Sequence, residues 1–97
     1  MDDFTTRPGE ANLFGLKQSD LNKVEPLKTP LSSMTPTIIE KDGKLFMALG
    51  SPGGPRIINS VFQVSFHALT TPFNIDEIIQ APRVHHQFSP DKLYYDR

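Results

Sequence analysis

The dipeptide Asp42-Gly43 lies between two runs of strand-forming residues, TPTIIEK and KLFMALG. Asp-Gly tolerates the positive φ angles of a two-residue type I′ turn, so a β-hairpin is predicted over residues 35–50. The second run is apolar at each successive position from Leu45 to Leu49. Such a strand is typical of the centre of a layered sheet, where both faces are buried. A lone hairpin could not bury both faces, so other layers are needed.

The first 30 residues contain few apolar side chains and several residues that interrupt helices and strands. These are Pro8, Gly9, Gly15, Pro26 and Pro30, and they predict an extended or irregular segment. A stretch of that length without regular structure is usually functional, or is held by parts of a larger protein. A chain of 97 residues hides only about two-thirds of its unfolded surface on folding. We therefore expect a loop-rich small fold or a fragment.

A helix is expected after the hairpin, beginning near Pro55 and ending before Pro72. Proline fits the first turn of a helix because its missing N–H has no partner there in any case. The apolar residues suit a helix that is buried over much of its surface: Ile57, Ile58, Val61, Phe62, Val64, Phe66 and Leu69.

A second, short helix is expected over IDEIIQA, with Asn74 as its N-cap and Pro82 as its stop. Residues 83–97 are expected to run as a loop and then a short strand from Leu93 to Tyr95. The predicted fold class is therefore α+β, with an irregular N-terminal segment, a hairpin and two helices.

Charge and composition exclude several kinds of partner. The formal net charge is -1 and the isoelectric point is near 6.3, which predicts no basic surface for nucleic acid or for an anionic membrane. No apolar run approaches the roughly 20 residues that span a bilayer, and the start, MDDFTTRPGE, is unlike a signal peptide. The absence of cysteine excludes disulfides and a cysteine nucleophile. No cofactor is expected.

The strand that ends in Gly50-Ser51-Pro52-Gly53-Gly54 runs straight into a helix. Consecutive N–H groups at a helix N-terminus can hold an anion or a developing oxyanion, because the helix dipole and the unpaired donors both favour negative charge. From the local residues alone, a tight strand-to-helix turn is the simpler explanation of Gly53 and Gly54.

Two further groups of polar residues could bind a substrate. Ser32 and Ser33 offer adjacent hydroxyls and amides that can hold a carboxylate without adding charge. Asp2 and Asp3 could bind an amino group. Taken alone, the serines are better explained by an ordinary loop, and the aspartates by a solvated chain end.

His85 and His86 invite a metal interpretation, but adjacent histidines point in different directions in most backbones, and no third ligand follows at metal-site spacing. We expect no metal; one ring should be hydrogen-bonded and the other exposed. His67 is expected to be a hydrogen-bonded core or interface residue, and Arg83 a structural arginine.

Five motifs resemble, in order and spacing, the small catalytic subunit of the gamma-glutamyltranspeptidases. They are MDDF, KTPLSSMTPTII, DGK, LGSPGGPRII and APRVHHQF, and the resemblance covers essentially the whole chain. It implies an N-terminal-nucleophile hydrolase with a four-layer αββα sandwich, in which self-cleavage of a precursor frees an N-terminal threonine. That threonine attacks the γ-glutamyl amide of glutathione or a related donor.

The resemblance also implies roles for five residues. Asp3 would bind the α-amino group of the substrate, and Ser32 and Ser33 its α-carboxylate. The N–H groups of Gly53 and Gly54 would hold the oxyanion.

On this comparison residues 1–34 are a substrate-binding loop, 35–50 a hairpin, 51–82 the glycine turn with the helices, and 83–97 a tail. Together they form a partial small-subunit domain from the C-terminal part of that subunit. The motif that includes Met1 lies downstream of the family's nucleophile, so these 97 residues are expected to lack that threonine and to be inactive alone. The family implies a large subunit and an upstream small-subunit segment as partners, and a periplasmic or extracellular location.

A different hypothesis is a non-catalytic remnant or binding module. Exposed apolar faces and strand edges favour association with another chain or with a second copy. This alternative stays open from the sequence.

Overall fold

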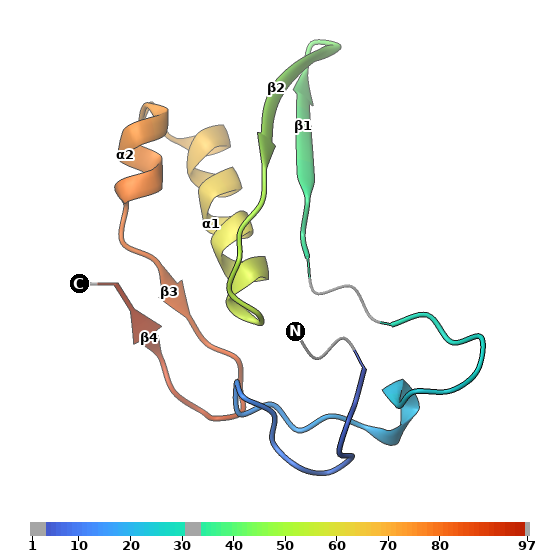
Figure 1. Ribbon diagram of the computed structural model, residues 1–97. Helices are drawn as coiled ribbons and strands as arrows, with labels where there is room; N and C mark the ends of the chain where they lie inside the picture. The colour runs from blue at the N-terminus through green and yellow to red at the C-terminus, as the bar shows by residue number, and fades with distance from the viewer. Residues whose placement is uncertain (1–3, 31–33, 97) are drawn as a thin grey trace.

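The computed structural model describes residues 4–30 and 34–96. Its elements, in order, are a short 3-10 helix η1 (Asp20–Asn22), strands β1 (Thr37–Lys41) and β2 (Lys44–Leu49), helices α1 (Arg56–Thr70) and α2 (Ile75–Gln80), and strands β3 (Val84–His85) and β4 (Tyr94–Tyr95). The α+β class, with a hairpin followed by two helices, is confirmed (Figure 1).

The hairpin has the turn that its sequence predicts. Asp42 and Gly43 have φ angles of 54° and 71°, as a type I′ turn requires at both central positions. Ile39 lies opposite Met47, but the next residue along β1 lies opposite Leu45. Phe46 is therefore an extra residue, and the hairpin carries a β-bulge there.

The expected burial of β2 on both faces is wrong for this chain taken by itself. Among the described residues β2 pairs only with β1, and the side chains of Leu45 and Phe46 are 68% and 46% exposed. The physical reason is that no other strand or layer in the described part of the chain covers the hairpin.

Helix α1 begins directly after Pro55, whose φ of -65° is already helical. The helix ends where the backbone N–H and the hydroxyl of Thr71 both donate to the carbonyl of His67, at 2.9 and 2.7 Å. Ile57, Val61 and Val64 are the buried residues of α1, at the spacing of one helical face.

The opposite side of α1 is exposed, which corrects the prediction of a helix buried over much of its surface. Ile58, Phe62, Phe66 and Leu69 are each more than half exposed. We call these four residues the apolar stripe. Among the described residues α1 packs mainly against α2 and β3, and these elements leave the apolar stripe exposed.

Helix α2 begins with a capping box. The side chain of Asn74 accepts from the N–H of Glu77 at 3.0 Å, and the carboxylate of Glu77 accepts from the N–H of Asn74 at 2.8 Å. Two of the unpaired donors of the first turn are satisfied in this way, so the predicted N-cap is confirmed.

The tail folds back on itself. Val84 pairs with Tyr95, and His85 pairs with Tyr94, so the predicted strand near Tyr95 is confirmed. The partner strand β3 was missed because two residues are too few to show an alternating pattern.

The N-terminal segment is irregular, as predicted, apart from η1 and two isolated bridges. One bridge joins Thr5 to Lys23 and the other joins Ala11 to Lys17. They fold the segment into a flat loop beneath the helices (Figure 1).

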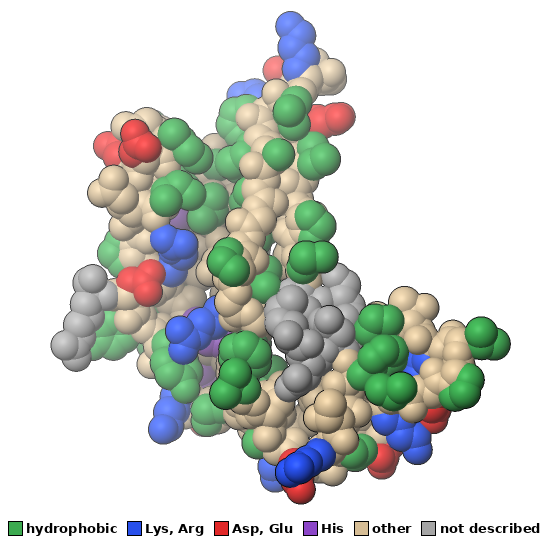
Figure 2. All heavy atoms as spheres, viewed as in Figure 1, with side chains coloured by type: hydrophobic (Ala, Val, Ile, Leu, Met, Phe, Trp, Pro, Cys, Tyr) green, Lys and Arg blue, Asp and Glu red, His purple; other side chains and the backbone are tan. Residues whose placement is uncertain are grey.

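The whole chain is open and thin. Its radius of gyration is 16.3 Å and its extents are 45 × 34 × 15 Å, whereas a compact domain of this size has a radius of gyration of about 13 Å. Among the described residues the buried apolar side chains are Ile57, Val61, Val64 and Ile78. Figure 2 shows hydrophobic side chains lying open over the hairpin and the helices. The described residues therefore leave many of their large apolar side chains exposed.

Candidate active site

The glycine turn between β2 and α1 is the centre of the candidate site. Gly53 and Gly54 have φ angles of 131° and 58°, in the region that residues with a side chain rarely adopt. The carbonyls of Gly53 and Gly54 accept the N–H groups of Arg56 and Ile57 at 3.2 and 3.1 Å. The turn therefore directs its carbonyls into the start of α1.

The N–H groups of the same two glycines remain available. In the described part of the chain neither Gly53 nor Gly54 donates a backbone hydrogen bond. They precede a helix of 15 residues, whose dipole places partial positive charge at this end. This turn can accept an anion on backbone donors, as its sequence allows.

Phe14 lies against the glycine turn and was not anticipated. A β-carbon built on Gly54 would lie 2.5, 2.8 and 2.9 Å from three atoms of the Phe14 ring. Gly54 is thus required by close approach as well as by its φ angle. Asn12 and Gly15 indicate a turn around Phe14, but nothing in the sequence shows that the turn reaches residue 54.

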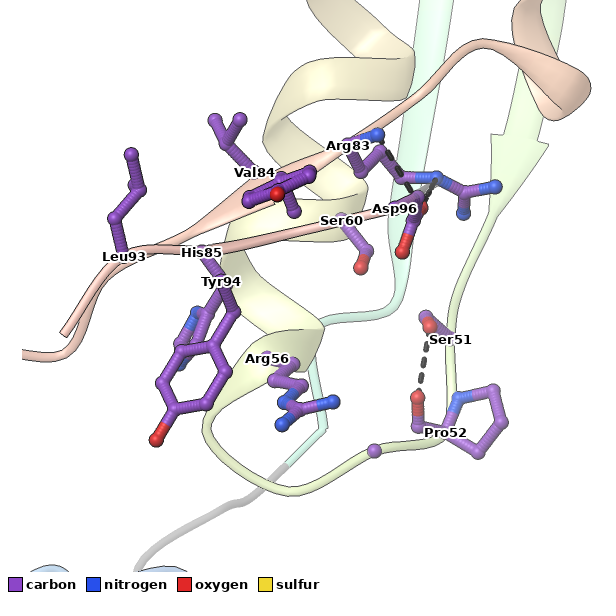
Figure 3. Close-up of a pocket in the computed structure, with 12 residues that line it drawn as sticks. Ser51, Pro52, Arg56, Ser60, Arg83, Val84, His85, Leu93, Tyr94 and Asp96 are labelled. Carbon is purple, nitrogen blue, oxygen red and sulfur yellow. Dashed lines mark hydrogen bonds and ion pairs between the residues drawn. The ribbon is translucent and has the colours of Figure 1, made fainter.

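A pocket of about 650 Å³ lies beside Ser51, Pro52 and Gly53 of the turn (Figure 3). Its polar lining includes Arg56, Ser60, Arg83, Tyr94 and Asp96. The guanidinium of Arg56 lies 5.0 Å from the centroid of the Tyr94 ring, a cation–π contact that keeps the charge at the pocket. Two guanidiniums and one carboxylate line it, so its charge is net positive.

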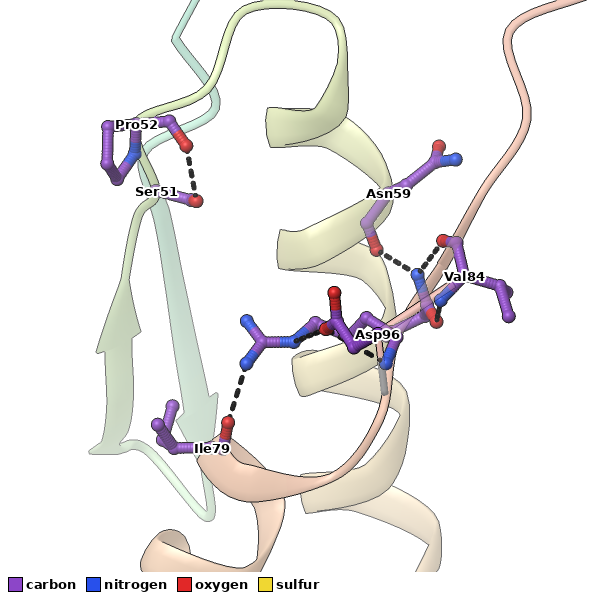
Figure 4. A network of polar contacts seen from close by, with 8 residues as sticks. Ser51, Pro52, Asn59, Ile79, Val84 and Asp96 are labelled. Atoms are coloured by element: carbon purple, nitrogen blue, oxygen red, sulfur yellow. Dashed lines mark hydrogen bonds and ion pairs between the residues drawn. The ribbon is translucent and has the colours of Figure 1, made fainter. Parts of the chain in front are cut away.

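Arg83 is held by backbone and by an acid, as the sequence predicts. Its Nη2 donates to the carbonyl of Ile79 at 2.6 Å, and its Nε lies 3.8 Å from Oδ2 of Asp96. The backbone N–H of Arg83 donates to the same carboxylate at 3.2 Å. Arg83 therefore joins Ile79 in α2 to Asp96, the residue after β4, and these two partners are labelled in Figure 4.

Gln63 fastens β3 to α1. Its amide nitrogen donates to the carbonyls of Asn59 and Val84 at 3.0 and 2.8 Å, and its oxygen accepts from the N–H of Val84 at 3.0 Å. These hydrogen bonds hold Val84, the residue after Arg83, against α1, the helix that follows the glycine turn (Figure 4).

The two adjacent histidines have different environments. His85 is 7% exposed and both ring nitrogens are paired, with Asn59 at 3.0 Å and Gln87 at 2.8 Å. His86 is more exposed and pairs with Asp91 at 2.8 Å. In the described ranges no three His, Cys, Asp or Glu residues are grouped so that they could hold a metal ion.

His67 departs from its prediction. It lies half-buried between Phe66 and Phe73, with ring centroids 6.1 and 6.3 Å away. Its Nδ1 is buried without a partner among the described residues, so the expected hydrogen bond is not formed there.

The other predicted site residues, Asp3, Ser32 and Ser33, lie outside the described residues. The structure describes residues close to them in sequence: the N–H of Thr5 donates to the carbonyl of Asn22 at 2.8 Å, and β1 begins at Thr37.

Among the described helices, none has the length and apolar character that a membrane span needs.

The family model described as gamma-glutamyltranspeptidase matches residues 1–97. The chain belongs to the gamma-glutamyltranspeptidase family.

Curated relatives agree with this assignment. A glutathione hydrolase proenzyme of Escherichia coli K12 is 48% identical over 97 residues, which are 100% of this chain and 17% of the relative. Scoloptoxin SSD14 of Scolopendra dehaani is 42% identical over 99% of this chain and 17% of its own length. The chain therefore spans about one-sixth of these relatives.

Solved structures confirm the fold class. A mutant of Helicobacter pylori gamma-glutamyltranspeptidase superposes with a TM-score of 0.89 and 48% identity, over 99% of this chain and 52% of that chain. The enzyme of Pseudomonas nitroreducens complexed with L-DON gives 0.86 and 47%, over 98% and 50%. These structures have the N-terminal-nucleophile hydrolase fold, and the hairpin and helix of this chain belong to that fold. This chain corresponds to about half of each matched chain.

Proposed function

We propose that this chain supplies the substrate-binding and oxyanion-binding parts of an enzyme that transfers or hydrolyses γ-glutamyl groups. The observation that carries the proposal is the glycine turn at the N-terminus of α1, whose two N–H groups have no partner among the described residues, in a chain of this family. Relatives that are named glutathione hydrolases support glutathione as the donor.

The turn would act when a hydroxyl adds to the γ-amide carbonyl. Addition would form a C–O bond, move the carbonyl π electrons onto oxygen, which becomes an oxyanion, and pass the hydroxyl proton to a base such as the free amine of an N-terminal threonine. When the oxyanion collapses, the C–N bond would break, and the leaving amine would take that proton. N–H groups of Gly53 and Gly54 would donate to that oxygen, with the helix dipole behind them. The Phe14 ring would keep water from one side of Gly54, and a hydrogen bond to an anion is stronger where water is excluded.

The ends of the glutamyl group would be recognised by residues outside the described ranges. Asp3 would bind the α-ammonium through its carboxylate, and the hydroxyls and amides of Ser32 and Ser33 would bind the α-carboxylate. The carboxylate, a hydrogen-bond acceptor, would thus face the cationic ammonium, and the hydroxyl and amide donors would face the anionic carboxylate.

The nucleophile would come from outside these 97 residues. In the proposed enzyme an N-terminal threonine forms the acyl-enzyme, which water or an acceptor amine then resolves. The large subunit and the upstream part of the small subunit would complete the site, so the chain alone is proposed to be inactive.

Hydrolysis of a γ-glutamyl anilide tests the proposal. We expect no turnover by the 97-residue chain above a blank. In a full-length enzyme that carries this chain, Asp3→Asn and Ser33→Ala are each expected to lower kcat/KM by roughly 10–100-fold, since a lost hydrogen bond to a charged group costs about 1.5–3 kcal/mol.

Ser19→Ala is the matched control, because Ser19 is exposed and makes no side-chain cap. It is expected to leave kcat/KM unchanged. Wild-type rates in Asp3→Asn and Ser33→Ala would contradict the binding roles, and turnover by the isolated chain would contradict its proposed inactivity.

The apolar stripe on α1 favours a second candidate, a module that associates through this surface. Ile58 and Phe62 are 64% and 65% exposed, on a helix whose other face is buried. In the enzyme proposal the same stripe would meet the rest of the fold, so the two candidates differ in what covers the stripe in the working protein.

A further inference from the structure

Gln87 links the segment after β3 to the loop that carries Phe14. Its amide nitrogen donates to the carbonyls of Phe14 and Ser89 at 2.7 and 3.0 Å. We propose that Gln87 is a positioning residue that holds the ring of Phe14 against Gly54. The structural part of this proposal stands on its own; only its consequence for an oxyanion rests on the proposed function.

The direction of the hydrogen bonds is fixed by two backbone carbonyls. Because both Phe14 and Ser89 present acceptors, Gln87 must direct its NH₂ group toward them. Its oxygen Oε1 then faces Nε2 of His85 at 2.8 Å, so this nitrogen carries the hydrogen. Nδ1 of His85 is left as the acceptor, and Asn59 donates to it at 3.0 Å.

These contacts form a closed path that begins and ends at the glycine turn. From Gly54 the chain enters α1 and reaches Asn59, which bonds His85 in β3. His85 bonds Gln87, which bonds the carbonyl of Phe14, and the Phe14 ring returns to Gly54. Asn59 lies in α1 and is only five positions after Gly54. The path therefore fixes the position of Phe14 relative to the glycine turn through a short stretch of helix.

Two hydrogen bonds from the backbone to the side chain of Asn12 brace the loop around Phe14. The side chain of Asn12 accepts from the N–H groups of Phe14 and Leu16 at 2.9 and 3.0 Å. A β-carbon on Gly15 would lie 3.1 Å from Cδ of Pro90, so the loop also rests on the tail near Gln87.

The Phe14 ring therefore covers one side of Gly54. A ring held there excludes water from one side of the turn and restricts what can approach its N–H groups. Without the bond from Gln87, the loop loses its hydrogen-bonded tie to the tail, and the ring is expected to leave Gly54.

Nuclear magnetic resonance of protein labelled at glycine and valine measures the contact directly, without any assay of activity. The ring current of Phe14 is expected to displace the α-proton resonances of Gly54, and Phe14→Leu defines the undisplaced value. Gln87→Leu is expected to bring these resonances to the Phe14→Leu value. Gln80→Leu, the same change at an exposed residue of α2, should leave them at the wild-type value.

Gln87→Glu tests the donor alone, because glutamate keeps an oxygen for His85 and removes the N–H group that serves Phe14. It is expected to shift Gly54 as Gln87→Leu does, with the α1 resonances of Val61 and Val64 unchanged. Wild-type Gly54 resonances in either variant would overturn the proposal. Loss of the α1 resonances in both variants would also overturn it, since Gln87 would then support the whole fold. A failure of the enzyme proposal would leave these shifts unaffected.

Discussion

The ring of Phe14 touches Gly54, although 39 positions separate them in the chain. A β-carbon on Gly54 would lie 2.5 Å from ring atom Cζ. A side chain of the irregular N-terminal segment thus packs against the glycine turn that precedes α1.

Gly54→Ala is expected to destabilise the protein and to slow γ-glutamyl hydrolysis in the full-length enzyme. The φ angle of 58° costs a residue with a β-carbon about 1–2 kcal/mol, and the new methyl group must displace Phe14. If the turn moves away from the oxyanion, kcat should fall by about 10²–10³-fold, as when an oxyanion donor is lost. Denaturant unfolding and steady-state kinetics measure the two effects.

Gly50→Ala is the matched control, since a β-carbon on Gly50 meets nothing within 4 Å and its φ angle is not positive. The double variant Phe14→Ala, Gly54→Ala should recover part of the lost stability, because it removes the clash and leaves the backbone strain. Additive effects of the two substitutions would show that the ring and the glycine do not interact.

Arg83→Lys is expected to destabilise the tail by about 1–2 kcal/mol. Lysine cannot donate to the carbonyl of Ile79 and also approach Asp96 in the same planar geometry. Hydrogen exchange of the Asp96 N–H, which donates to the carbonyl of Arg83 at 3.0 Å, should become faster.

Arg7→Lys is the comparison for Arg83→Lys. Arg7 pairs with Glu10 at 3.5 Å with both side chains largely exposed, and such pairs contribute little. Equal effects of the two substitutions would contradict a structural role for Arg83.

The 97-residue chain is expected to self-associate through the apolar stripe. Phe62 and Phe66 stack with ring centroids 6.1 Å apart and are 65% and 52% exposed. The double variant Phe62→Asp, Phe66→Asp should therefore sediment as a smaller species than wild type at equal concentration.

Phe88→Asp is the control for self-association. Phe88 is 83% exposed but lies outside the stripe, so its substitution should leave the sedimentation unchanged. A wild-type monomer at high concentration would remove the support for an associating module.

Lys28→Met is expected to raise the pKa of Glu25. The hydrogen bond from Lys28, and then its charge, hold the pKa of Glu25 below its ordinary value; Lys23 adds a smaller effect and desolvation opposes them. Because the folded-state pKa is lowered, the pair stabilises the fold above the unfolded-state pKa, and this is lost as pH falls through the folded-state pKa. Carbon-detected titration of Glu25 measures the change.

Lys44→Met, at the exposed hairpin tip, should leave the titration of Glu25 unchanged. Because the carboxyl of Glu25 is at the surface, salt should weaken the effect of Lys28. A titration midpoint of Glu25 that is the same with and without Lys28 would contradict the pairing.

Local signals in the sequence predicted most of the elements. Asp42-Gly43 specifies positive φ at two adjacent positions, and Asn74 with Glu77 satisfies helix donors within one turn; both need only neighbours in the chain. The strand β3 and the helix η1 were missed because each is too short for a periodic pattern to appear.

Burial could not be predicted correctly from the same residues. The apolar pattern shows which side chains of β2 and α1 are favoured to be buried. It does not show whether other residues of this chain pack over them. Leu45 and Phe62 are exposed here for that reason. The similar solved structures are chains about twice as long as this segment.

The sequence by itself determined the glycine turn, because Gly53 and Gly54 are the residues that tolerate its backbone angles, and the ordered motifs identified the family. The tertiary structure alone decided what stands beside the turn. Phe14 reaches Gly54 through a path that passes Gln87, His85 and Asn59. Contacts between residues so far apart depend on how the loop, the tail and the helix pack together, and no local pattern records that packing.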